Sequence, residues 1–150
     1  MDFAGLAVFL VEAKVNTYAA QKGIVVPARK GSHDLAYKKG DYFYVDSYFG
    51  EKDFSGEEVV YLEEDPVWSM NYYGRMLREN VADGFIETLR EALMKVGTRE
   101  PYRGCRYYKR GAHEYFCTAE GAVQFFHGCE TVEYEKKEVY RLYFHGGQLR

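Results

Sequence analysis

The chain has 150 residues, of which 47% are hydrophobic and 29% charged, a composition typical of a folded globular protein. This excludes wholesale disorder, a collagen-like repeat and a coiled coil. A net charge of -3 gives no general attraction to phosphate backbones or anionic lipid, so we expect neither a membrane partner nor direct nucleic-acid binding. The 15 Tyr and 10 Phe favour β-structure, because flat rings pack well on a pleated surface.

The sequence predicts a cytoplasmic protein without a metal or cofactor. Its longest apolar run, residues 3–11, is about nine residues long, whereas a membrane span needs roughly 20. Asp2 stands where a signal peptide would be basic. The cysteines are odd in number and form no Cys-x-x-Cys pair, which argues against a disulfide framework and a zinc site. We expect each to be a small apolar strand residue: Cys105, Cys117 and Cys129.

A helix is predicted over residues 3–19, because apolar residues recur there at helical spacing. The segment from Gly23 to Gly40 carries Pro, Gly, Ser and four basic residues, and is predicted to be a surface connection and a candidate lid. From residue 41 the period changes to two, which predicts a strand ending at Gly50. Short turn-rich links then favour an antiparallel meander with two further strands, over residues 58–62 and 67–73.

A second helix is predicted over residues 82–96, with Asp83 as its N-cap and Gly97 at its end. Five strands follow, over residues 105–109, 112–118, 122–127, 131–135 and 138–145. We therefore expect one α+β domain spanning residues 1–150, with a curved, mainly antiparallel β-sheet of about seven or eight strands and two main helices packed on or within it. Short aromatic-plus-glycine echoes indicate strand ends rather than an internal repeat: residues 48–50, 72–74, 125–128 and 143–146.

Familiar catalytic signatures are missing: the sequence lacks a Gly-x-Ser-x-Gly elbow, a P-loop, a dinucleotide fingerprint and a His-Glu-x-x-His motif. Asp46 lies among tyrosines on one strand face, and Asn71 is unusual in a strand. Each is either a solvated polar residue or an orienting group in an aromatic pocket. Trp68 and Tyr72 share one face of their strand, and Asn71 lies on the other. Acidic runs at loop ends are expected to be exposed charge: residues 57–58 and 63–65.

Several motifs spread over almost the whole chain carry a family resemblance. They are Phe9-Leu10-Val11-Glu12-Ala13-Lys14 with Thr17-Tyr18-Ala19, Gly40-Asp41-Tyr42 with Asp46, Phe54-Ser55-Gly56-Glu57, Val67-Trp68-Ser69-Met70-Asn71-Tyr72 with Gly74, Tyr102-Arg103-Gly104, and Tyr143-Phe144-His145-Gly146-Gly147. In this order they resemble an uncharacterised bacterial and archaeal domain of unknown function. Members of that family often follow an Xre-type helix-turn-helix domain in predicted transcriptional regulators, which implies a sensor or dimerisation module. Here the motifs begin close to Met1, so we expect no DNA-reading helix pair and a module that acts alone or in trans.

Three hypotheses follow. The favoured one is a small-molecule-binding, sensor-like or regulatory module with one pocket lined by Lys14, Thr17, Tyr18, Asp46, Glu57, Trp68, Asn71, Tyr72 and Arg103. A small enzyme is the alternative, with Asp46 or Glu57 as general base and Lys14 or Arg103 stabilising negative charge; the sequence leaves enzymatic activity open. The third hypothesis, combined with the first, is a homodimer formed through the tyrosine-rich sheet, since aromatic residues are enriched at interface cores.

Overall fold

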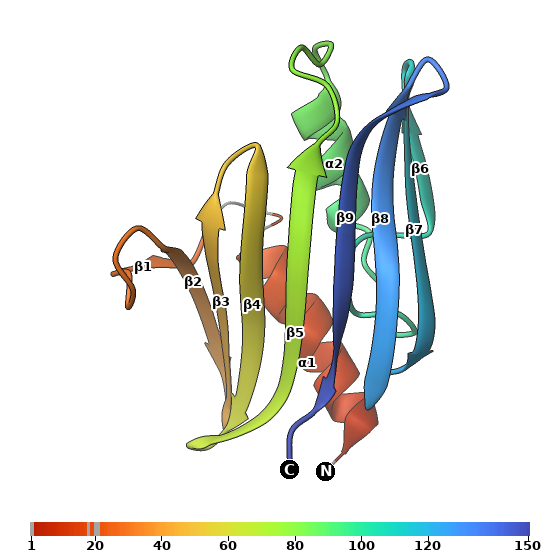
Figure 1. Cartoon of the computed structure of the whole chain (residues 1–150). Helices are drawn as coiled ribbons and strands as arrows, with labels where there is room; N and C mark the ends of the chain where they lie inside the picture. The colour runs from red at the N-terminus through yellow and green to blue at the C-terminus, as the bar shows by residue number, and fades with distance from the viewer. Residues whose placement is uncertain (1, 18, 20–21) are drawn as a thin grey trace.

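The computed structural model describes residues 2–17, 19 and 22–150. Within them, nine strands form one antiparallel sheet in the order β1-β2-β3-β4-β5-β9-β8-β7-β6, and both helices lie on the same face of that sheet (Figure 1). This confirms the predicted α+β class, with nine strands where about seven or eight were expected. The elements are α1 (Phe3–Asn16), β1 (Ile24–Val25), β2 (His33–Lys39), β3 (Tyr42–Gly50), β4 (Asp53–Leu62), β5 (Asp65–Met76), α2 (Phe85–Leu93), β6 (Tyr107–Arg110), β7 (His113–Ala122), β8 (Phe125–Tyr134) and β9 (Lys137–Gln148).

The first helix forms where its apolar spacing predicts, but it ends at Asn16 rather than at residue 19. Asp2 caps its start by accepting a hydrogen bond from the Ala4 amide at 3.0 Å. Leu6 and Leu10 are fully buried beneath the sheet. Lys14, in the last turn, is buried as well. Helix α1 therefore places one basic side chain, that of Lys14, in the protein interior.

The second helix is shorter than residues 82–96, and the predicted N-cap Asp83 is wrong. The cap position is held by Gly84 in the left-handed conformation, with φ of 99° and no side-chain cap. Glycine tolerates this conformation because it has no Cβ, and it lets the chain turn sharply into the helix. Phe85 and Leu89 then face the core, while Ile86 stays about half exposed.

The predicted surface connection over residues 23–40 is also wrong, because it contains β1 and β2. Its basic residues hid the alternation in which Leu35 and Tyr37 face the helices and Asp34 faces away. Asp34 is buried because the Ala28 amide and the Ser47 hydroxyl both donate to its carboxylate. The strand boundaries shift in the same way further on. β4 begins at residue 53, and the two strands predicted over residues 122–135 are one strand, β8.

The two halves of the sheet repeat the same arrangement, which the short echoes alone did not establish. Each half consists of a helix followed by a run of antiparallel strands, and the last strands of the two halves, β5 and β9, pair at the centre of the sheet. The β4–β5 segment recurs in β8–β9 at a constant offset of 72 residues, as from Gly56 to Gly128. The shared pattern is Phe-x-Gly-x-Glu-x-Val, which occupies residues 54–60 and 126–132.

Close packing explains why the glycines of this pattern recur. A Cβ at Gly56 would collide with the ring of Tyr72, and a Cβ at Gly128 would collide with the ring of Phe144. Tyr72 and Phe144 are themselves equivalent positions, each directly paired with the glycine of its neighbouring strand. In each half, one aromatic ring therefore packs directly against the backbone of a glycine.

Candidate functional site

A groove opens between α2 and the strands at the β1 end of the sheet. Its outer chamber, of about 380 Å³, is mainly apolar and is lined by Ile24, Val25, Pro27, Ser32, His33, Asp34, Leu35, Tyr48, Ile86, Leu89 and Arg90. A second chamber, of about 240 Å³, shares His33 and Tyr48 with the first and is lined by His33, Tyr48, Gly50, Glu51, Phe54, Tyr72 and Arg103. It is called the inner chamber because Tyr72 and Arg103 in its lining are buried. The rings of His33 and Tyr48 stack with their centroids 5.0 Å apart and border both chambers.

Behind the inner chamber lies a cluster of buried charged side chains. Arg103 borders both the chamber and a small cavity of about 10 Å³, which is also lined by Lys14 and Glu58. Lys14 forms a buried ion pair with Glu58. Burial lowers the pKa of Lys14, and the Glu58 charge opposes this effect. Buried charged side chains, those of Lys14, Glu58 and Arg103, therefore lie next to the inner chamber.

Asp46 is a second buried carboxyl of this cluster and, unlike Glu58, forms no ion pair among the described residues. It lies directly opposite Glu58 on the neighbouring strand and accepts a hydrogen bond from the Tyr72 hydroxyl at 2.7 Å. Burial, followed by the charge of Glu58, raises its pKa to about 7. The hydrogen bond from Tyr72 and the charges of Lys14 and Arg103 act in the opposite direction. Asp46 can therefore gain or lose a proton near neutral pH.

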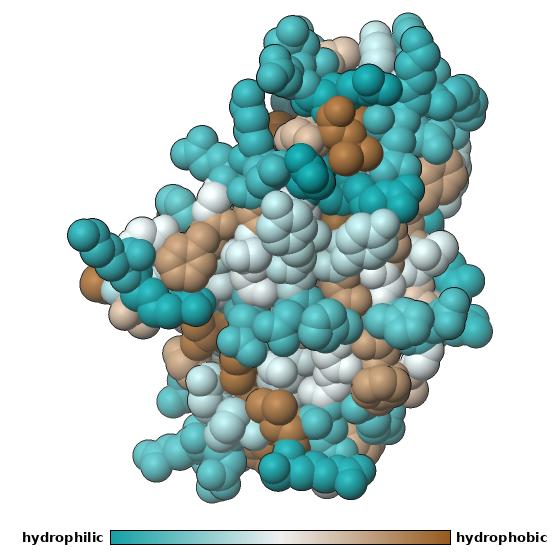
Figure 2. Space-filling view, viewed as in Figure 1, coloured by the Kyte–Doolittle hydropathy of each residue, from teal (hydrophilic) through white to brown (hydrophobic). Residues whose placement is uncertain are grey.

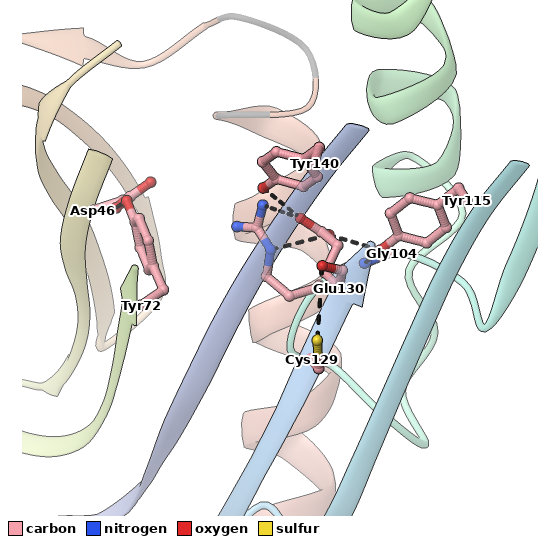
Figure 3. A network of polar contacts seen from close by, with 8 residues as sticks. Asp46, Tyr72, Gly104, Tyr115, Cys129, Glu130 and Tyr140 are labelled. Carbon is pink, nitrogen blue, oxygen red and sulfur yellow. Dashed lines mark hydrogen bonds and ion pairs between the residues drawn. The ribbon is translucent and has the colours of Figure 1, made fainter. Parts of the chain in front are cut away.

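Glu130, the equivalent of Glu58 in the second half, has more hydrogen-bond partners than Asp46. Arg103 donates from Nε at 3.2 Å and from Nη2 at 3.0 Å. Tyr115 and Tyr140 donate their hydroxyl protons at 2.7 Å and 2.9 Å. Figure 3 shows these contacts converging on Glu130, with Asp46 and Tyr72 paired separately. The charge of Arg103 is thereby matched within the fold.

Four of the sequence-predicted site residues come together here. Lys14 and Arg103 border the small cavity, Tyr72 lines the inner chamber, and Asp46 lies behind Tyr72. Thr17 is buried and donates its hydroxyl proton to the Ala13 carbonyl.

The remaining predicted site residues lie elsewhere or outside the description. Glu57 and Asn71 are directly paired on the opposite face of the sheet, as strand alternation requires. Trp68 is fully buried, stacks on Phe126 and donates to the Val123 carbonyl, so it belongs to the core. Tyr18 lies outside the described residues.

The sequence interpretation missed Glu58, Glu130, His33 and Tyr48. Glu58 was taken as exposed charge at a loop end, and this is wrong because β4 continues through it and turns it inward onto Lys14. The signal that could have found both glutamates is the repeated Phe-x-Gly-x-Glu-x-Val pattern. No comparable signal marks His33 or Tyr48, since both reach the chambers through the pairing of β2 with β3.

The chain matches the model of a known protein family. A family model described as a domain of unknown function, DUF5680, matches residues 46–149. The chain belongs to the DUF5680 family. Comparison with curated proteins and with solved structures finds no match. The DUF5680 match begins at Asp46 and includes Tyr72, Arg103 and Glu130, so most of the buried cluster lies in the family's own segment.

Two further findings bear on the site. Among the residues that the structure describes, no three His, Cys, Asp or Glu side chains gather in a way that could hold a metal ion. No helix in the described part of the chain is long and apolar enough to cross a membrane.

Proposed function

We propose that this chain is a small-molecule-binding module of the sensor-like or regulatory kind, with its ligand in the groove between α2 and the β1–β3 strands. The observation that carries the proposal is the continuity of the groove. An apolar outer chamber leads past His33 and Tyr48 to an inner chamber bordered by Tyr72 and Arg103, with Asp46 directly behind. Ligand pockets are typically apolar clefts with a few placed polar groups.

The size and lining of the two chambers indicate a small amphipathic ligand. Ile86 on α2 and Leu35 on β2 face the outer chamber, so an apolar body can lie between helix and sheet. The inner chamber offers tyrosine hydroxyls and charged groups to a polar end. Together the chambers match the range of a few hundred Å³ that is usual for small-molecule sites.

Native mass spectrometry of protein purified under mild conditions tests the proposal, because one spectrum reports the subunit count and any retained small-molecule mass. Ile86→Glu places a charge in the apolar lining at a half-exposed helix position and should abolish the adduct. Val8→Glu is the matched control, since Val8 is 49% exposed and Ile86 48% exposed, but Val8 lies on α1 and does not border either chamber. Protein that carries no adduct, and that binds no member of a small-molecule library at the groove, would contradict the proposal.

A regulatory role and a homodimer are part of the same proposal. The resemblance to domains that follow Xre-type helix-turn-helix segments supports a role in regulation, for which we propose a cytoplasmic location. Tyr73 and Tyr143 are directly paired on the sheet face away from the helices, and both are about half exposed, as is Tyr107 at the β6 edge. Figure 2 shows that hydrophobic side chains are scattered over this face among hydrophilic ones. Aromatic residues of this kind support a dimer contact.

Enzymatic activity is the second candidate, and Asp46 is the observation that favours it. A buried carboxyl with a pKa of about 7 has the acidity expected of a general base at neutral pH. Turnover that disappears in Asp46→Asn, while the variant keeps its folded circular-dichroism spectrum, would support catalysis. Glu57→Gln is the matched control, because Glu57 lies on the opposite sheet face. Equal loss of turnover in both variants would contradict a role for Asp46.

A further inference from the structure

The inner chamber is bordered by four aromatic rings, those of His33, Tyr48, Phe54 and Tyr72. Phe54 and Tyr72 meet edge to face with their centroids 6.1 Å apart, while His33 and Tyr48 are stacked. The face of an aromatic ring carries partial negative charge and attracts cations, and several rings around one space form the kind of site that holds quaternary ammonium groups. The Arg103 guanidinium already lies 5.6 Å from the centre of the Tyr72 ring.

In the inner chamber, Glu51 is the charged lining residue that forms no ion pair among the described residues, since Arg103 pairs with Glu130. Glu51 borders the inner chamber and Asp46 lies behind Tyr72. Of the two nearby arginines, Arg103 is matched by Glu130, and Arg90 lies in the outer chamber.

We infer that the inner chamber binds the ammonium group of an amphipathic organic cation, with the four rings around it and Asp46 behind Tyr72 as the counter-charge. The inference rests on the proposed function, because it assigns a charge class to the ligand of the same groove. The apolar part of the cation lies in the outer chamber against Leu35 and Ile86.

The test compares two probes that share a phenyl ring and differ in charge, benzyltrimethylammonium and phenylacetate. Each is titrated at pH 8 and constant ionic strength, and binding is followed by calorimetry and by the NMR shifts of Tyr48 and Tyr72. The cation should bind at least tenfold more tightly. Tighter binding of phenylacetate at the same residues would overturn the cation inference and leave the proposed groove intact. If neither probe binds there, the cation inference is contradicted, while the proposed groove is judged by the adduct and the library screen described above.

Substitution of one ring separates charge recognition from folding. Tyr48→Ala removes a wall of the chamber and should weaken binding of benzyltrimethylammonium by about threefold to thirtyfold, the range expected for a cation–π contact. Tyr48→Phe keeps the ring and should stay within about twofold of the wild type on the same grounds. Tyr73→Ala is the control, since this tyrosine lies on the opposite sheet face and is half exposed. Equal weakening by Tyr48→Phe and Tyr48→Ala would contradict a role for the ring.

The counter-charge is tested by pH. The titratable and charged groups near Asp46 are Glu58 from β4, Tyr72 from β5, Lys14 from α1, Arg103 from the connection after α2, and Tyr44 and Tyr48 from its own strand. Affinity for the cation should rise between pH 6 and pH 8 as Asp46 ionises, and this rise should disappear in Asp46→Asn. His33→Phe is measured beside it, because a protonated imidazole would also repel a cation. A rise that survives in Asp46→Asn would show that Asp46 is not the counter-charge.

Discussion

The two halves of the sheet carry a buried glutamate at equivalent positions, but the contacts of the two glutamate side chains differ. Glu58 and Glu130 each follow the same glycine by two residues and turn inward toward the helices. In the C-terminal half, an arginine and two tyrosines converge on Glu130, and the register partner of Glu130 is Cys117. In the N-terminal half the register partner of Glu58 is Asp46, a second carboxyl.

Two further differences between the halves lie beside that second carboxyl. Tyr72 replaces Phe144 and supplies the hydroxyl that reaches Asp46. Tyr48 stands at the position of Ala119 and adds a wall of the groove. In the C-terminal half, the charge of Glu130 is therefore compensated by contacts within the fold. In the N-terminal half, Asp46 has one hydrogen bond, from Tyr72, and Tyr72 borders the inner chamber. The proposed ligand groove thus lies beside the half in which a buried carboxyl is less fully compensated.

Removing the glutamate from each half should give the largest difference in stability. Glu130→Gln removes the carboxylate that Arg103 contacts through two nitrogens and should lower the free energy of unfolding by about 3–5 kcal/mol, the usual cost of breaking a buried pair. Glu58→Gln should cost less, because Asp46 is close enough to take over as counter-ion for Lys14. Urea unfolding of both variants measures the two losses. Equal losses would mean that Asp46 does not compensate.

The pH dependence of stability should separate Asp46 from the rest of the chain. Its pKa is about 7 in the folded protein and near 3.8 ordinarily, so the folded state holds the proton more tightly. The stability that this proton contributes is fully present below pH 3.8 and is lost as the pH rises toward 7. The shift corresponds to a total on the order of 4 kcal/mol.

Asp46→Asn carries no titrating group at this position and should therefore show a flatter stability curve between pH 4 and pH 7. The difference between the curves of the variant and the wild type cancels the contributions of other titrating groups. Urea unfolding at half-unit pH intervals measures it. Parallel curves for the two proteins would show that Asp46 titrates at its ordinary pKa and that the N-terminal half is as well compensated as the other.

The contrast between the halves also marks how far the sequence could predict this molecule. The alternation along β3 and β5 and the apolar spacing of α1 are local patterns, and they placed these elements correctly apart from their ends. The prediction failed at β2, where basic residues hid the alternation and a buried carboxylate, Asp34, lies on the outward face. Burial of Asp34 depends on hydrogen bonds from another strand and a loop, which no local pattern reports.

The site was predictable to a similar degree. Lys14, Asp46, Tyr72 and Arg103 could be chosen as polar or aromatic members of motifs, but their convergence depends on the sheet order, which places β5 beside β9. Grouping Asn71 with Tyr72 in one pocket conflicts with strand alternation, since neighbouring residues of a strand face opposite sides. His33 reached the site only through pairing with β3. The hydrophobic periodicity and the turn residues of a sequence do not report which distant strands pair.

The repeated glycines should show intermediate and nearly equal effects. Gly56→Ala and Gly128→Ala each force a methyl group against a buried ring and should cost about 1–3 kcal/mol, as overpacking does. Gly97→Ala is the control, because no atom lies within 4 Å of its added Cβ, and it should stay within about 0.5 kcal/mol. Of the two strand variants, Gly56→Ala alone should also weaken ligand binding, since it displaces Tyr72 from Asp46. Equal effects of Gly56→Ala and Gly128→Ala on ligand binding would contradict the placement of the ligand beside the N-terminal half alone.

The smallest expected effect comes from one hydroxyl in each half. Tyr44 and Tyr115 are equivalent, fully buried tyrosines. The Tyr115 hydroxyl donates to Glu130 and accepts from the Gly104 amide, so Tyr115→Phe should cost about 1–3 kcal/mol. The Tyr44 hydroxyl has no hydrogen-bond partner among the described residues, so Tyr44→Phe should be neutral or slightly stabilising.

Thermal unfolding of the two phenylalanine variants at one pH distinguishes these outcomes. The two substitutions remove the same atom from the same place in the repeat, so differences in size and hydrophobicity cancel between them. A cost at Tyr44 as large as that at Tyr115 would mean that the Tyr44 hydroxyl is bonded in solution, most directly to Glu58, whose charge helps raise the pKa of Tyr44. Glu58 would then be compensated much as Glu130 is, and the asymmetry that leaves Asp46 beside the groove would lose its physical basis.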